Sequence, residues 1–271
     1  MWPTLFVSHG SPTVAIDDTP AHRFLSALGR RLWRPRAILC CSAHWETGWP
    51  AVTGSPAPAT IHDFYGFPPP LYELRYPAPG DPELAREVVE MLREAGLAAE
   101  VDPGRGLDHG AWIPLLLVYP EADIPVLQLS VQTPLGPEHH WRTGEVLAKL
   151  RRRDVLLMGS GALTHNLADA LGRLRRGVTS TSEPVPRWAV EFDAWMTRAV
   201  EAGAREDLLA YRRRAPHAAY AHPTEEHILP LFFAAGAGGG RGRKVHDSFE
   251  FGSLSMAVFA FPDLPQGGGR G

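Results

Sequence analysis

Four short apolar runs, each ending in polar residues or a glycine turn, most constrain the fold of this chain of 271 residues. The runs are Leu5–Val7, Arg36–Ser42, Pro125–Ser130 and Val155–Met158. Segments with helical spacing lie between and after them, at Pro20–Trp33, Pro82–Ala95, Glu138–Leu150, Trp188–Ala202 and Pro223–Ala234. Short apolar strands that alternate with helices are typical of a sheet covered on both faces.

The sequence therefore predicts an α/β fold, a single domain with a mixed, mostly parallel central sheet flanked by helices on both faces. We expect this domain to span residues 1–264, because the last residues, 265–271, are rich in glycine. Such a terminal segment is expected to form a flexible tail.

Charge and composition exclude several classes of partner. The chain has 27 Lys and Arg against 30 Asp and Glu, a net charge of −3, which argues against binding to nucleic acid. The sequence has no apolar run of the roughly 18 residues that a membrane span needs, so no membrane partner is expected. The two cysteines, Cys40 and Cys41, are adjacent on a predicted strand and are expected to be buried and reduced, which fits a cytoplasmic location.

The placement of the 12 histidines is the most informative feature for function. His9, His44 and His165 each follow a predicted strand, and His222 precedes the predicted helix Pro223–Ala234. In open α/β sheets the ligand crevice lies outside the carboxyl ends of the strands, so these side chains could converge there. Neutral imidazole suits iron, zinc, copper and nickel. Spacing alone leaves a metal site and a set of structural histidines equally open.

Other patterns speak against further chemistry. His222 and His227 are five residues apart, which is roughly 140° around a helix, so we expect that they do not share one metal and that His227 lies on a helix face. His139 and His140 are expected to face solvent at a helix start. Gly159-Ser160-Gly161 does not match the nucleophile elbow G-x-S-x-G, so a serine hydrolase is unsupported.

Eight motifs, in order over nearly the whole chain, carry a family resemblance. They are Phe6-Val7-Ser8-His9-Gly10-Ser11-Pro12, Ser42-Ala43-His44-Trp45, His62-Asp63-Phe64-Tyr65-Gly66-Phe67-Pro68, Tyr76-Pro77-Ala78-Pro79-Gly80, Leu107-Asp108-His109-Gly110-Ala111-Trp112, Gly159-Ser160-Gly161-Ala162-Leu163-Thr164-His165-Asn166-Leu167, His222-Pro223-Thr224-Glu225-Glu226-His227 and Ser248-Phe249-Glu250-Phe251-Gly252-Ser253-Leu254-Ser255-Met256. Together they closely resemble the 4,5-DOPA dioxygenase group within the class III extradiol ring-cleavage dioxygenases.

The resemblance implies a non-haem metal-dependent enzyme with one divalent metal per chain. It assigns His9, His44 and His222 to the metal and places His165 at the metal's edge, as a catalytic base or a fourth ligand. It places His109 nearby as a second acid/base group. Fe(II) is the implied metal for ring cleavage, and a set of imidazoles is also a good zinc site.

The implied reaction opens the ring of a catechol, DOPA-like or caffeate-like, with insertion of both atoms of O2. His62 and Tyr65 are predicted substrate contacts, on an aromatic segment that forms either a lid or a satellite hydrophobic cluster. The alternatives are a zinc-dependent hydrolase, a zinc-bound catechol-binding protein on the same fold, and a binding module without metal. The sequence leaves the particular catechol and the oligomeric state open.

Overall fold

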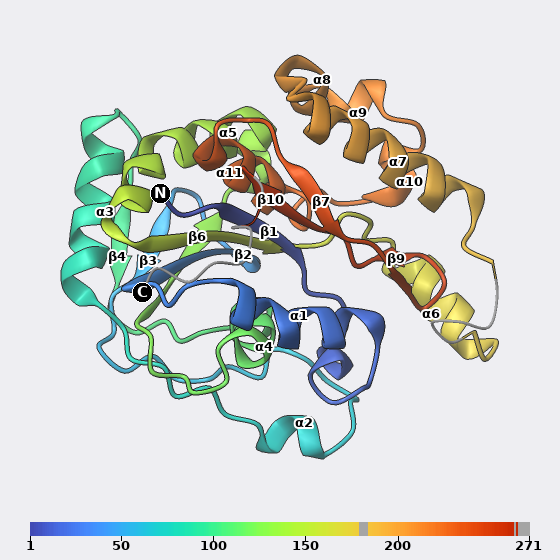
Figure 1. Ribbon diagram of the computed structural model, residues 1–271, viewed down its shortest axis with the longest axis horizontal. Coiled ribbons are helices and arrows are strands. Elements are labelled where there is room, and N and C mark those ends of the chain that lie inside the picture. The colour runs from blue at the N-terminus through green and yellow to red at the C-terminus, as the bar shows by residue number, and fades with distance from the viewer. Residues whose placement is uncertain (179–183, 263, 265–271) are drawn as a thin grey trace.

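In this computed structural model, residues 1–178, 184–262 and 264 are described, and they build an eight-stranded sheet (Figure 1). Its strands are β1 (Thr4–Ser8), β2 (Ala37–Glu46), β3 (Ala51–Thr53), β4 (Glu100–Asp102), β5 (Val126–Val131), β6 (Val155–Gly161), β7 (Arg243–His246) and β10 (Val258–Phe261). They lie side by side in the order β4-β3-β5-β2-β6-β1-β10-β7. The central strands β5, β2, β6 and β1 are parallel. At one edge β10 pairs antiparallel with β1 and β7 antiparallel with β10, and at the other edge β3 pairs antiparallel with β5. The predicted mixed, mostly parallel sheet is confirmed.

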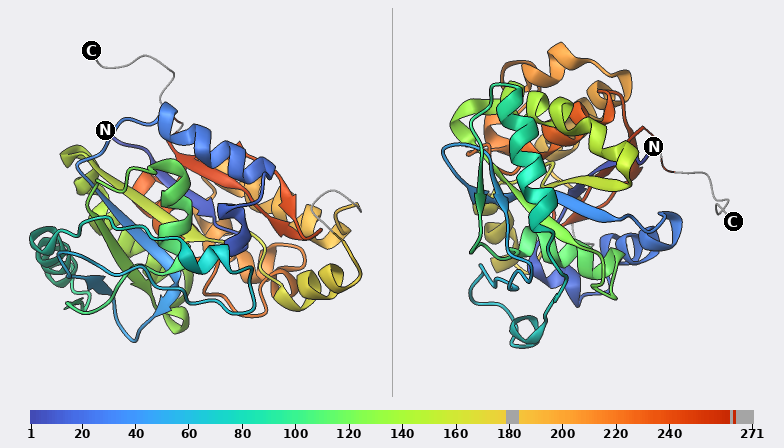
Figure 2. Two further views of the ribbon diagram at one scale, coloured as in Figure 1. Left: turned by 90° about the horizontal axis from the view of Figure 1, so that it is seen from below. Right: turned by 90° about the vertical axis from the view of Figure 1, so that its left-hand side faces the viewer.

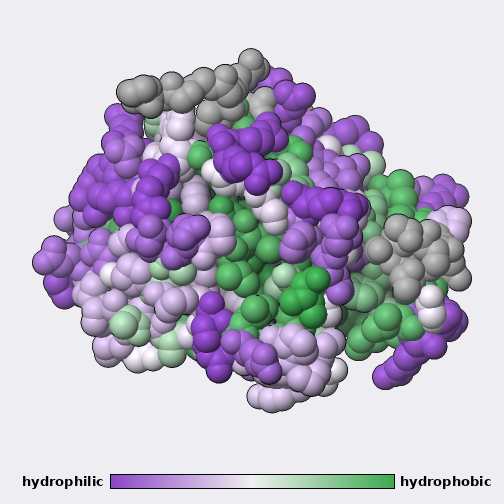
Figure 3. All heavy atoms as spheres, turned by 60° about the horizontal axis from the view of Figure 1, so that its bottom comes forward, coloured by the Kyte–Doolittle hydropathy of each residue, from purple (hydrophilic) through white to green (hydrophobic). Residues whose placement is uncertain are grey.

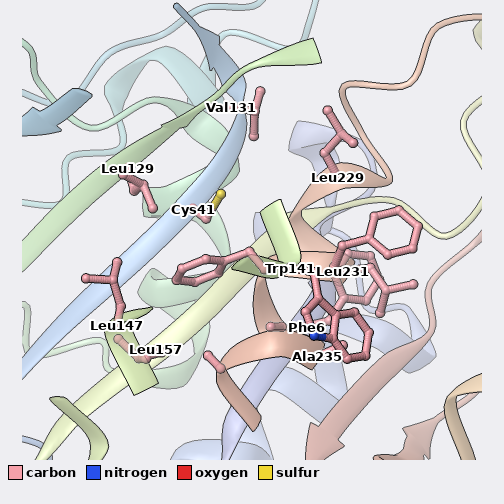
Figure 4. Packing of buried hydrophobic residues seen from close by; sticks show 14 of the residues in the cluster. Phe6, Cys41, Leu129, Val131, Trp141, Leu147, Leu157, Leu229, Leu231 and Ala235 are labelled. Atoms are coloured by element: carbon pink, nitrogen blue, oxygen red, sulfur yellow. The ribbon is translucent and has the colours of Figure 1, made fainter. Parts of the chain in front are cut away.

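Helices cover both faces of the sheet, as predicted (Figures 1 and 2). One face carries α3 (Pro82–Glu94), α5 (Gly136–Leu147), α7 (Arg187–Ala202) and α11 (Leu229–Gly238), and the other carries α1 (Pro20–Arg31) and α4 (His109–Val118). Each layer encloses its own hydrophobic cluster. In the first, Trp141 and Leu147 from α5 lie near Leu157 of β6, and α11 adds Leu231 and Ala235 (Figure 4).

Short elements complete the described chain. They are η1 (Pro12–Ala15), α2 (Pro70–Glu73), η2 (Thr133–Leu135), η3 (Ala148–Arg153), α6 (Leu167–Arg175), α8 (Arg205–Leu209), α9 (Tyr211–Arg214), α10 (Ala218–Ala221), β8 (Phe249–Glu250) and β9 (Leu254–Ser255). Strands β8 and β9 pair with each other on either side of Gly252, whose φ of 71° suits glycine.

Helix α11 begins at Leu229, so the predicted helix start at Pro223 is wrong. Pro230 lies in the first turn of α11, where its missing N–H costs nothing. A helix that began at Pro223 would hold Pro230 in its interior and would lose a backbone hydrogen bond there. The segment 222–228 is therefore a turn rather than a helix, so helix geometry does not set the directions of its side chains.

Two glycines of β6 let this turn approach the sheet. A Cβ at Gly161 would lie 2.0 Å from the carbonyl oxygen of His227, and one at Gly159 would lie 2.1 Å from that of Pro230. Real Cβ atoms do not approach backbone that closely, so glycine is needed at both positions. The β6 motif therefore seats the turn before α11 against the carboxyl end of the sheet.

The helices, the surface and the two cysteines can each be compared with what the composition predicts. Within the described residues, every helix is too short or too polar to cross a lipid bilayer. Figure 3 shows mostly hydrophilic residues, with hydrophobic ones gathered near the centre of the view. Cys40 and Cys41 are buried and free, as predicted. The predicted tail at 265–271 lies outside the described residues.

Candidate metal centre

His9 and His44 meet at the carboxyl edge of the sheet. His9 directly follows β1, and its backbone N–H donates to the Gly161 carbonyl at 2.9 Å, which continues the pairing of β1 with β6. His44 lies near the end of β2, on the other side of β6. The Nε2 atoms of His9 and His44 are 3.0 Å apart. The side chains of two histidines that are 35 residues apart in the sequence therefore meet in the fold.

His227 is the third imidazole at this point. Its Nε2 lies 3.2 Å from Nε2 of His44. The Ala162 N–H, just beyond β6, donates to the His227 carbonyl at 2.8 Å and so fixes the backbone of the turn. We call His9, His44 and His227 the three-imidazole cluster.

His222 does not occupy the position that the resemblance gave it. Its Nε2 donates to the Leu163 carbonyl at 2.8 Å, and its ring packs between Phe192 and Tyr211, with centroid distances of 5.6 and 6.5 Å. Nε2 of His222 is thus engaged by a backbone hydrogen bond, whereas its Nδ1 is buried without a hydrogen-bond partner. His227 takes the expected place of His222, because the segment between them is a turn rather than a helix.

His109 lies beside the three-imidazole cluster, as the resemblance implied. It is the first residue of α4, after the N-cap Asp108, and its ring centroid is 3.9 Å from that of His44. His9, His44 and His109 each offer a ligand atom within 4.8 Å of the others. Asp63 accepts a hydrogen bond from the His109 backbone N–H at 2.9 Å. The same carboxylate oxygen is 3.0 Å from Nδ1 of His109, although these two atoms are not aligned for a hydrogen bond.

His165 flanks the cluster on the other side. Its ring is stacked on that of His227, with centroids 3.4 Å apart and an angle of 11° between the planes. Its Nδ1 is 3.9 Å from a carboxylate oxygen of Glu226, which also lies 2.9 Å from Nδ1 of His227. His165, Glu226 and His227 form a second close group of donor atoms.

Burial keeps these imidazoles neutral. Burial, and after it the charge of His44, holds the pKa of His9 well below its usual value. Burial and the neighbouring His109 lower the pKa of His44 to about 3. For His227 the lowering is again large, from burial first and His165 second, and burial lowers the pKa of His165 to about 4. Neutral imidazole is the form that binds a metal or accepts a proton.

Each Nδ1 of the three-imidazole cluster faces an oxygen. His9 Nδ1 is 3.0 Å from Oγ of Ser160, His227 Nδ1 is 2.9 Å from Glu226, and His44 Nδ1 is 3.6 Å from Asp63. The contacts at 3.0 and 2.9 Å favour a hydrogen on Nδ1 of His9 and of His227, which leaves a lone pair on each Nε2, whereas Asp63 lies beyond hydrogen-bond distance of His44 Nδ1. The Nε2 atoms of His9 and His227 both face Nε2 of His44, so a cation could be bound between these nitrogens.

The donor spacing fits a divalent metal. Two nitrogens bound at about 2.0–2.1 Å to one ion, at tetrahedral or octahedral angles, lie roughly 2.8–3.4 Å apart. The Nε2 separations of 3.0 and 3.2 Å fall in this range. Histidine ligands that donate their other N–H to a carboxylate or hydroxyl are typical of metal sites. His9, His44 and His227 could therefore hold iron or zinc.

The two predicted substrate residues have different surroundings. Nε2 of His62 lies 3.0 Å from the Leu74 carbonyl and 3.2 Å from the Arg75 guanidinium, and the His62 ring packs edge-on against Trp112, with centroids 5.6 Å apart. Tyr65 is 89% exposed. Its neighbour Phe64 is buried, with its ring edge-on to that of His109 at a centroid distance of 5.6 Å. Phe64 thus belongs to the hydrophobic cluster under α1 and α4, and Tyr65 is the exposed aromatic residue of this segment.

Two residues of this site were not predicted from the sequence, and a third was misplaced. No role was assigned to Asp63 or Glu226, and His227 was expected on a helix face. The proline of the first helical turn, Pro230, was the signal that places His227 before α11. The prediction that His140 faces solvent is also wrong, because His140 is only 2% exposed.

Comparisons with known proteins agree with this geometry. Residues 3–262 match a family model described as the catalytic LigB subunit of aromatic ring-opening dioxygenase. A 4,5-DOPA dioxygenase extradiol from Beta vulgaris is 43% identical over 95% of this chain and 96% of its own length. A protein of the same description from Escherichia coli is 37% identical, over 94% of this chain and 92% of its own.

A solved structure shares the fold. The crystal structure of an uncharacterized protein from Escherichia coli K12 superimposes with a TM-score of 0.77 and 33% identity, over 96% of this chain and 100% of that one. The chain therefore belongs to the family of catalytic LigB subunits of aromatic ring-opening dioxygenases, and it is an enzyme of that kind related to the 4,5-DOPA dioxygenase group.

Proposed function

We propose that this enzyme opens the ring of a catechol beside its two hydroxyls, inserts both atoms of O2, and does so at one divalent metal held by His9, His44 and His227. The observation that supports this most is the convergence of three Nε2 atoms, 3.0 and 3.2 Å apart, with an oxygen facing each Nδ1. Three protein ligands would leave positions open for a substrate and O2.

Fe(II) is the metal that suits the reaction. When bound, it supplies chelation of the two catechol oxygens and the electron transfer to O2 that ring opening requires. Zinc fits the same imidazoles but cannot change its oxidation state, so a zinc-loaded protein would bind a catechol without opening it. Family membership favours ring opening over the zinc hydrolase that the sequence left open.

The residues around the three-imidazole cluster would handle the protons. His165 is neutral and 15% exposed at its side chain, so its ring can accept a proton from a catechol hydroxyl. His109, whose ring lies against that of His44, would donate a hydrogen bond or a proton to the reacting oxygen. Asp63 would hold His109 in place through its backbone N–H.

The substrate class is a catechol with a side chain. Similar proteins are described as 4,5-DOPA dioxygenases, so DOPA is the first substrate to test, and caffeate is the second. His62 and Tyr65 stay the proposed substrate contacts. The two buried free thiols suit a reducing compartment, and we propose a cytoplasmic location.

An oxygen-uptake assay tests the proposal. Metal-free enzyme is loaded with Fe(II) without air, then mixed with air-saturated buffer and DOPA or caffeate. We expect O2 consumption together with a yellow semialdehyde product, and neither in enzyme loaded with zinc. Absence of O2 uptake by iron-loaded enzyme with every catechol tried would refute the proposed function.

A further inference from the structure

We propose that Ser160 is a positioning residue, which fixes the His9 side chain with its hydrogen on Nδ1 and its lone pair on Nε2. The inference rests on the proposed function only in that His9 is taken as a metal ligand. Ser160 lies on β6 between the two glycines of the motif Gly159-Ser160-Gly161, and it is fully buried.

The hydrogen-bond direction at Ser160 is determined by its partners. A serine hydroxyl has one hydrogen to donate. Oγ of Ser160 donates it to the carbonyl of Gly110, which can only accept. Nδ1 of His9, 3.0 Å from the same oxygen, must therefore be the donor in the second contact. Nε2 of His9 then carries no hydrogen and faces Nε2 of His44.

The Gly110 carbonyl is available for a reason written in the sequence. In a helix, this carbonyl would accept from the N–H four residues later. That residue in α4 is Pro114, which has no N–H. A buried carbonyl without a partner is costly, so the Ser160 hydroxyl is held in this direction. Pro114 thereby influences the His9 ring through Gly110 and Ser160.

The site also needs a small residue next to this contact. A Cβ at Gly110 would lie 2.6 Å from Oγ of Ser42 and 3.0 Å from a ring carbon of His44. The start of α4 therefore presses against both β2 and β6. This close packing leaves the Ser160 hydroxyl between a helix carbonyl and the His9 imidazole.

The first experiment reads the tautomer directly in the metal-free protein. Enzyme labelled with nitrogen-15 at histidine gives separate NMR signals for protonated and unprotonated ring nitrogens, and the variant His9→Gln assigns the His9 signal by its absence. At pH 7.5 we expect His9 with its hydrogen on Nδ1. In Ser160→Ala we expect a mixture, or the hydrogen on Nε2. Wild-type enzyme with the hydrogen on Nε2 would overturn the proposal even if the Ser160 variant fails to fold.

The second experiment measures metal affinity by titration with Co(II), followed by absorbance. Loss of the partner of a metal-binding histidine typically costs about 10- to 100-fold in affinity, and we expect this for Ser160→Ala. Ser160→Thr keeps the hydroxyl and should retain more affinity than the alanine variant. Ser130→Ala is the matched control, since Ser130 is also buried at the end of a central strand but its hydroxyl accepts from the Ala51 amide at 2.9 Å.

The outcomes separate this inference from the proposed function. An unchanged His9 tautomer with unchanged Co(II) affinity in Ser160→Ala would overturn the positioning role. Failure of the iron-loaded enzyme to open catechols would leave the tautomer result intact, because that measurement uses neither iron nor substrate.

Discussion

Two groups of buried or half-buried histidines show that burial alone does not mark a metal site. The three-imidazole cluster and the pair His139 and His140 both lie beyond central strands. Burial lowers the pKa of His140 to about 3, as it does for His44. Nδ1 of His140, however, donates to the Gly136 carbonyl at 2.7 Å, and its Nε2 accepts from the Gln132 N–H at 3.1 Å. Both ring nitrogens of His140 are used, whereas the Nε2 atoms of His9, His44 and His227 face one another. The direction of the second nitrogen separates a ligand from a structural histidine.

The strongest test of this contrast replaces one histidine from each group. His44 faces both other members of the three-imidazole cluster, so His44→Ala should lower the metal affinity by more than the roughly 100-fold expected for loss of a histidine's hydrogen-bond partner. Ring opening should fall with it, by about 1000-fold or more. The protein with His140→Gln should keep the bound metal, as measured by elemental analysis after gel filtration. A His44→Ala protein with full metal content would break the distinction.

The third ligand is tested by a second pair. His227→Ala should lose most of the bound metal and the activity, because it removes an Nε2 at 3.2 Å from that of His44. His222→Ala should keep the metal but lose about 1–3 kcal/mol of stability, since it removes the buried hydrogen bond to Leu163. Urea unfolding and metal analysis of the two variants decide the matter. The opposite pattern would restore His222 as the ligand.

Metal removal should destabilise the wild type alone. A metal present at 100 times its dissociation constant stabilises the folded state by about 2.7 kcal/mol. Chelation should remove this amount from the free energy of unfolding of wild-type enzyme, and almost none from His44→Ala. Equal losses in the two proteins would mean that the stabilising metal is bound elsewhere.

Acid should destabilise the protein partly through His140. The pKa of His140 falls from 6.5 in the unfolded chain to about 3 in the folded one, so its contribution to stability is complete above pH 6.5 and is lost as the pH falls toward 3. Between pH 7 and pH 5 this amounts to about 2 kcal/mol. Urea unfolding of metal-free protein should show a smaller pH dependence in His140→Gln by that amount. Identical pH dependence would mean that the pKa of His140 is the same in the folded and the unfolded chain.

The smallest effect is expected at the exposed aromatic residue. Tyr65 is 89% exposed, so any contact with substrate forms only when substrate is bound. Tyr65→Ala should raise KM about 2-fold and leave kcat unchanged, the pattern of lost uniform binding. Steady-state kinetics with DOPA measure both constants. An unchanged KM would remove Tyr65 from the substrate contacts.

Local patterns predicted part of the site well. His9 and His44 follow apolar strands, and the carboxyl ends of parallel strands meet at one edge, so their proximity follows from the strand pattern. His227 was mispredicted, because a boundary error at Pro223 imposed helical geometry on a turn. Asp63 lies in a segment whose sequence pattern indicates aromatic packing and gives no sign of a role for its carboxylate. Its contact with His109 depends on how that segment folds over α4.

The sequence by itself determined the alternation of strands and helices, the edge where imidazoles gather and the family resemblance, because these depend on periodicity and local motifs. Only the tertiary structure decided which nitrogen of each histidine is left without a partner. That choice depends on groups far along the chain: Leu163 takes the Nε2 hydrogen of His222, and Ser160, held by Gly110, takes the Nδ1 hydrogen of His9. A hydrogen-bond partner is set by distance and direction in space, and spacing along the chain encodes neither.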